Sequence, residues 1–162
     1  MSKIQSIKLM FVTGLFAAVS ILSIAMSPSA LAVSCSGNGC NGTNPYTTGC
    51  SQNAFLVARY YFADARNGVY FIYPNDIELD VYYSRSCGTN WTRVTKNPYG
   101  GNTRKVVSLA NAPGTTLIEN DYGYSASYST QLYAPGSTRI LVSSYLYDTA
   151  GNARAYVLAK IL

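Results

Sequence analysis

The chain of 162 residues contains no histidine and only seven acidic residues, against 12 lysines and arginines. Histidine is a frequent general base and the commonest metal ligand, so its absence removes the usual routes to acid–base catalysis and to zinc binding. Charged residues make up 12% of the chain, and the basic ones are dispersed except for the pair Arg104-Lys105. A weak, dispersed positive charge forms no phosphate-binding stripe, and we therefore expect no nucleic-acid partner.

The N-terminal segment has the three parts of a signal peptide. Two lysines precede an apolar or small run over residues 9–26, and the small-x-small site Ala30-Leu31-Ala32 follows it. Such a site favours cleavage, although 18 apolar or small residues are also just long enough to begin spanning a bilayer. We expect residues 1–32 to be a signal peptide and residues 33–162 to be a single secreted domain, which meets a membrane only if the segment stays uncleaved.

Four cysteines follow the expected cleavage site, at Cys35, Cys40, Cys50 and Cys87. An even number in an exported chain predicts two disulfides. The rival zinc site would lack histidine and paired C-x-x-C spacing, so we expect no metal and no cofactor. Three pairings are possible, and each of them joins Cys87 to one of the other three cysteines. That bridge closes a loop of 37 to 52 residues (87 − 50 to 87 − 35), which would hold the N-terminal segment against the rest of the domain.

Two regions follow the signal peptide. Residues 33–52 are rich in glycine, asparagine and cysteine and have no apolar period, which predicts a cysteine-bound loop. Residues 53–162 alternate short β-type runs with turn residues and show no long helical period. This pattern predicts an all-β fold, a small disulfide-stabilised antiparallel sandwich or barrel.

The clearest expected strand covers residues 77–83, where Ile77, Leu79, Val81 and Tyr83 alternate with other residues. Further strands are expected over residues 55–63, 69–73, 91–95, 105–109, 115–119, 129–133, 139–147 and 153–161. The runs 55–63 and 153–161 contain good helix formers, and a helix is the alternative there. Turns are expected at Asn67-Gly68, over residues 97–102 and at Ala112-Pro113-Gly114.

Two stretches carry a resemblance to a known family. They are Cys35-x-Gly37-x-x-Cys40-x-Gly42-x-x-Pro45-x-x-x-Gly49-Cys50 and Leu79-x-Val81-x-Tyr83-Ser84-x-x-Cys87-Gly88-Thr89-Asn90-Trp91-x-Arg93-Val94. Over residues 34–94 the chain resembles a secreted bacterial family of domains of unknown function, the one numbered 2690. Asn44 departs from the aspartate that the family favours before the proline. The resemblance implies a domain exported alone or as the outer part of a membrane-anchored protein, and it brings no catalytic residue or ligand.

Aromatic residues are the candidate ligand contacts. Trp91 and Arg93 lie two residues apart on one expected strand, so they share a face and can stack; alternatively, Trp91 packs as core beside the disulfide of Cys87. The chain has 15 tyrosines, and Tyr122, Tyr124 and Tyr128 stand among glycine and serine, which is the composition of adaptable binding surfaces. The structural alternative is that tyrosine has a high β propensity.

The residues available for catalysis are few. Glu78 and Asp80 share a strand face at roughly 6.6 Å, near the spacing of two-carboxylate hydrolases, but such neighbours are usually solvated or paired with an arginine such as Arg85 or Arg93. We expect no enzyme. The expected function is a secreted, non-catalytic binding domain for a glycan or wall polymer at the cell surface or wall. A protein-binding module, such as an inhibitor or sensor ectodomain, is the alternative, and a minor hydrolase is the least favoured.

Overall fold

The computed structural model describes residues 32–66 and 77–162. Residues 1–31 of the expected signal peptide lie outside this range, as do the expected strand 69–73 and the expected Asn67-Gly68 turn. Within the described residues, no helix has both the length and the apolar character needed to cross a membrane.

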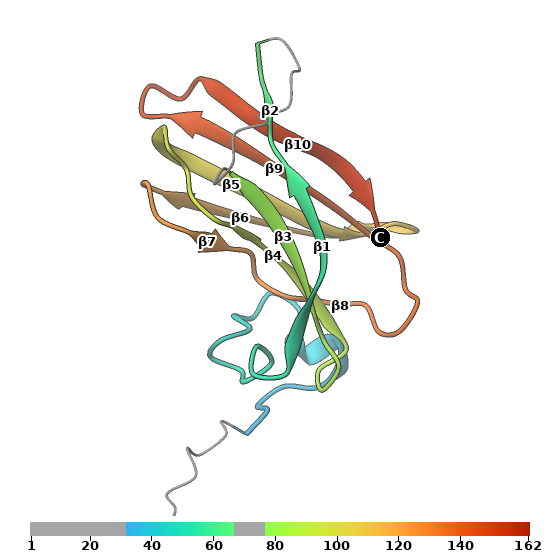
Figure 1. Cartoon of the computed structure of the whole chain (residues 1–162). Coiled ribbons are helices and arrows are strands. Elements are labelled where there is room, and N and C mark those ends of the chain that lie inside the picture. The colour runs from blue at the N-terminus through green and yellow to red at the C-terminus, as the bar shows by residue number, and fades with distance from the viewer. Residues whose placement is uncertain (1–31, 67–76) are drawn as a thin grey trace, which may run out of the picture.

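Two antiparallel sheets of five strands each form the domain (Figure 1). The first sheet contains, in order, β1 (Ala54–Tyr61), β3 (Glu78–Ser84), β4 (Thr89–Val94) and β7 (Ser127–Tyr128), and β8 (Leu132–Tyr133) also pairs with β4. The second sheet contains, in order, β2 (Ala63–Asp64), β10 (Ala153–Ile161), β9 (Ile140–Asp148), β5 (Gly100–Leu109) and β6 (Ala112–Tyr122). A single turn of 3-10 helix, η1 (Gly37–Cys40), precedes the strands. The all-β prediction is confirmed.

The core lies between the two sheets and is built by period-two alternation. Leu79 and Val81 of β3 and Val142 and Leu146 of β9 are buried in one cluster, together with Phe62 from the crossover between the sheets. Because alternate residues of a strand point to opposite faces, each sheet contributes one apolar face to this core. The alternation expected from Ile77 onward therefore corresponds to the face of β3 that is buried between the two sheets.

Both runs with a helical alternative are strands, β1 and β10. Several boundaries differ from the prediction, and the expected strand 129–133 is replaced by the two short strands β7 and β8, with residues 129–131 outside both. β5 begins at Gly100, inside the expected turn 97–102, and β6 begins at Ala112, because Leu109 pairs with Ala112 and the chain reverses between them. The turn expected at Ala112-Pro113-Gly114 is therefore misplaced. In the part of the chain that the structure describes, β6 is the outermost strand of its sheet, where the missing N–H of a proline need not cost a ladder hydrogen bond.

The N-terminal loop is held by two disulfides, Cys35–Cys40 and Cys50–Cys87. The structure thereby selects one of the three possible pairings, and Cys87 is joined to the loop as expected. The fully buried Gln131 is a second anchor: its Nε2 donates to Thr43 Oγ1 at 2.8 Å and Thr48 Oγ1 at 2.9 Å, and its Oε1 accepts from Thr89 Oγ1 at 2.8 Å. The loop is consequently a packed part of the domain and can contribute side chains to a site.

Candidate functional site

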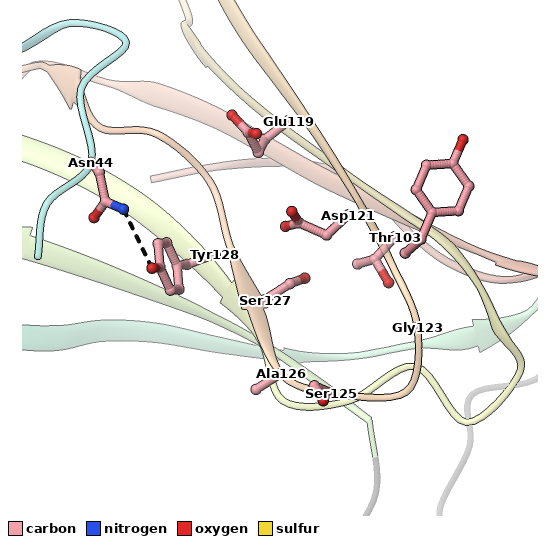
Figure 2. Close-up of a pocket in the computed structure, with 10 residues that line it drawn as sticks. Asn44, Thr103, Glu119, Asp121, Gly123, Ser125, Ala126, Ser127 and Tyr128 are labelled. Atoms are coloured by element: carbon pink, nitrogen blue, oxygen red, sulfur yellow. Dashed lines mark hydrogen bonds between the residues drawn. The ribbon is translucent and has the colours of Figure 1, made fainter.

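A pocket of about 400 Å³ lies between the N-terminal loop and the segment that joins β6 to β7 (Figure 2). Its lining residues are Asn44, Thr103, Glu119, Asp121, Tyr122, Gly123, Ser125, Ala126, Ser127 and Tyr128. The loop contributes Asn44, and β5 contributes Thr103. The other lining residues come from β6, from β7 and from the segment between these two strands. The loop therefore supplies one of the ten lining residues, and its anchoring to the sandwich holds Asn44 at the pocket.

Tyrosine side chains from opposite ends of the β6–β7 segment reach the pocket. Tyr122 is 82% exposed at the end of β6, and Tyr128 on β7 is 37% exposed. Tyr128 is held from the loop side, because Asn44 Nδ2 donates to its hydroxyl oxygen at 3.3 Å and the Tyr46 ring lies 4.6 Å from its ring centre. Burial raises the pKa of Tyr46, and the nearby positive charge of Arg93 opposes that rise.

A buried lysine fixes the polar wall of the pocket. The Lys105 side chain is fully buried, and its Nζ donates to Asp121 Oδ2 at 2.7 Å, Ser127 Oγ at 3.1 Å and the Thr103 carbonyl oxygen at 3.2 Å. These three acceptors use all the donors of an ammonium group. Asp121 keeps 44% of its side chain exposed, so one face of the carboxylate can meet a ligand while the other is anchored.

Sequence reasoning missed Lys105, which appeared only as half of a basic pair. The available signal was its position two residues before Val107 on an expected strand, because Val107 is fully buried and alternate residues share a face. Burial of a lysine is uncommon without partners, and the partners come from β6 and β7, which only the folded chain brings together.

We predict that Lys105 makes the free energy of unfolding depend on pH in the alkaline range. Burial lowers the pKa of Lys105 below its ordinary value of 10.5, and the hydrogen bond to Asp121 only partly opposes this. The unfolded chain then binds the proton more tightly, so the free energy of unfolding rises with pH between the lowered pKa and 10.5. The free energy of unfolding of wild type, minus that of Lys105→Met, should increase over this window in urea titrations. Subtracting the variant cancels the ionisation of tyrosines, and a flat difference would contradict the prediction.

The five predicted binding residues separate into two groups. Tyr122 and Tyr128 line the pocket. Tyr124 is 66% exposed but is not a lining residue; its ring lies over Gly100, where an added Cβ would collide with the tyrosine ring. Trp91 and Arg93 also lie outside the lining, on β4.

Trp91 is 1% exposed and stacks on Tyr82, with ring centres 5.8 Å apart and planes inclined by 16°. This burial favours packing over ligand contact for Trp91, and the neighbour that the structure shows is Tyr82 in place of the expected disulfide. Arg93 is half-buried and lies opposite Asp80 in the register of β3 and β4.

The carboxylates considered for hydrolysis are both bonded to an arginine. Arg59 Nε donates to Asp80 Oδ1 at 2.7 Å, and Arg59 Nη1 lies 3.3 Å from Glu78 Oε1. Asp80 is fully buried and Arg59 is on the neighbouring strand β1, in register with Asp80. The pair therefore joins β1 to β3, and the arginine is neither Arg85 nor Arg93.

The comparisons with known proteins agree with the two cysteine-containing stretches. A family described as "Protein of unknown function (DUF2690)" matches residues 38–140, which is more than half of the chain and includes the tyrosine-rich segment beyond Tyr99. No curated protein and no solved structure matches the chain. The family description carries no activity, so the site has to be interpreted from its own chemistry. On the extent of this match, the chain belongs to the DUF2690 family of proteins of unknown function.

Proposed function

We propose that the chain is an exported, non-catalytic binding domain whose pocket takes a neutral segment of a glycan or wall polymer. The observation that carries the proposal is the combination of Tyr122 and Tyr128, both exposed, with oxygen-bearing side chains in one pocket. An aromatic face packs on the apolar hydrogens of a sugar ring, while carboxylate, amide and hydroxyl groups bond its oxygens. Pockets that orient ligands commonly join apolar area with a few fixed polar groups in this way.

The charge of the lining favours a neutral ligand over a polyanion. Among the described residues, the lining includes Glu119 and Asp121 and no lysine or arginine. Lys105 lies behind Asp121, fully buried and bonded on all sides, so its charge is already compensated. A polyphosphate or a polyuronate would bring like charges next to Glu119, which is unfavourable at short range. We therefore place hydroxyl-rich, uncharged polymers first among the wall components.

Export is supported by the two disulfides, because such bonds persist in oxidising compartments outside the cytoplasm. The signal-peptide pattern of residues 1–32 supports the same location. The proposed mature protein begins at Val33, and its ligand is then a component of the cell surface or of the surroundings.

We predict that Tyr122→Ala weakens polymer binding by about 1–3 kcal/mol, which is about a 5- to 150-fold rise in Kd, because an exposed stacking contact is lost. The matched control is Tyr124→Ala. It removes another exposed tyrosine of the same segment that does not line the pocket, and it should leave Kd unchanged. Isothermal titration of the folded proteins against purified wall polymer, at two salt concentrations, measures both effects.

Salt should change the affinity little, because the proposed ligand carries no charge. Equal losses in the two variants would place the ligand outside the pocket. An unchanged Kd for Tyr122→Ala would remove that ring from the site, and absence of binding by wild type would reject the polymer tested.

A second candidate function, protein binding, is favoured by the outer strand β1. Three consecutive apolar residues, Phe55, Leu56 and Val57, are each about 40% exposed on β1, which is the outermost strand of its sheet among the described residues. An edge strand has unpaired backbone groups that can accept an added strand from a partner. Leu56→Lys should abolish recruitment of such a partner in pull-downs while leaving polymer binding intact. The opposite result, loss of polymer binding alone, would reject this candidate.

A further inference from the structure

The four cysteine sulfurs form one compact cluster. All four Sγ atoms lie within 4.8 Å of one another, and Cys35 Sγ lies 3.6 Å from Cys50 Sγ although these two are not bonded. Cys40, Cys50 and Cys87 are buried and Cys35 is half-buried. The two disulfides therefore pack against each other at a single point, where the N-terminal loop meets the turn between β3 and β4.

We propose that this cluster, once reduced, is a binding site for one thiophilic divalent cation such as Zn²⁺, held by all four cysteine thiolates. Sulfurs bound to a tetrahedral ion through bonds of about 2.3 Å are about 3.8 Å apart. The contact between Cys35 and Cys50 already has nearly this separation. The bonded pairs need only separate, and their Cα atoms are 5.2 Å and 5.8 Å apart, which leaves the adjustment to side-chain rotations.

The surroundings of the cluster suit thiolates. Gln131 Nε2 lies 3.6 Å from Cys35 Sγ and can share with it one of the two hydrogens that it donates to Thr43 and Thr48, and Ser86 Oγ lies 3.9 Å from Cys87 Sγ. Hydrogen-bond donors to ligand atoms are the usual second layer of a metal site, where they orient the ligands and reduce the excess negative charge. Cys35 is the most accessible of the four sulfurs and marks the side from which a reductant and a cation can approach.

Reduction of the two disulfides requires an added reductant, and a phosphine supplies the electrons. Each disulfide takes two electrons from one phosphine and two protons from solvent water, which yields two thiols and one phosphine oxide. The cation then forms four metal–sulfur bonds, and the four thiol protons leave to solvent. Cys87 is joined to the N-terminal loop in both states, by a disulfide in the oxidised protein and through the cation in the reduced protein. Oxidation would expel the cation, so the two states exclude each other.

The test uses the purified protein reduced by a phosphine under anaerobic conditions and titrated with Co²⁺. We expect the intense visible bands of tetrahedral cobalt and a near-ultraviolet thiolate-to-cobalt band, both saturating at one ion per chain and both lost when Zn²⁺ is added. The oxidised protein, which has the same sequence, should show neither band. Zinc should also raise the midpoint of thermal unfolding of the reduced protein.

The matched variant is Cys35→Ser/Cys40→Ser, which retains the Cys50–Cys87 disulfide and can be checked for folding in its oxidised form. After reduction it should lose the tetrahedral cobalt spectrum. An octahedral spectrum in wild type, no spectrum at all, or an identical tetrahedral spectrum in the variant would each overturn the proposal.

Discussion

Removing the Cys50–Cys87 disulfide with Cys50→Ser/Cys87→Ser should lower the free energy of unfolding by about 4 kcal/mol, and removing Cys35–Cys40 by about 2 kcal/mol. The difference follows from the sequence separations of 37 and 5 residues, because a bridge that closes a longer loop removes more conformations from the unfolded chain. The longer bridge also connects the N-terminal loop, which contributes Asn44 to the pocket, to the turn between β3 and β4.

Urea denaturation of both double variants, followed by fluorescence, measures this difference. The folded state of each variant should be confirmed first, with the remaining disulfide mapped by mass spectrometry. Equal losses, or a larger loss for the Cys35–Cys40 variant, would contradict the prediction and show that native-state contacts of the loop outweigh the loop-closure entropy.

Trp91→Ala should lower the free energy of unfolding by about 3–5 kcal/mol, because the variant leaves a cavity at a side chain that is 1% exposed. Tyr82 would also lose its stacking partner. Trp91→Phe is the matched control. It keeps an aromatic ring against Tyr82 and removes the Nε1 group, which has no hydrogen-bond partner among the described residues, so its loss should be much smaller.

The measurement is urea denaturation of both variants at one pH. If Trp91→Ala lowers the free energy of unfolding by less than about 1 kcal/mol, the indole does not support the fold. Trp91 would then again be a candidate binding residue. The same experiment on Tyr122→Ala should show almost no loss, because that side chain is 82% exposed.

Two of the lining tyrosines could be predicted from the sequence, but the full set of residues that form the site could not. Tyr122 and Tyr128 could be selected because tyrosine among glycine and serine is typical of binding surfaces. Tyr124 satisfied the same criterion and yet lies over Gly100, since the conformation of the β6–β7 segment decides which rings turn toward the pocket. Lys105 and Asn44 were not selected, because their roles depend on Asp121, Ser127 and Tyr128, which are remote from them along the chain.

The sequence by itself determined the all-β class, the loop character of residues 33–52, the even number of cysteines and the buried alternation of β3. These properties depend on local composition and on the two-residue period of a strand, both of which can be read within a short window. Only the tertiary structure decided which cysteine joins Cys87, and which strands are neighbours across the two sheets. It also decided that Asn44 meets Tyr128 across 84 residues of sequence. Such contacts are the outcome of sheet pairing and loop closure over long separations, and no local pattern specifies them.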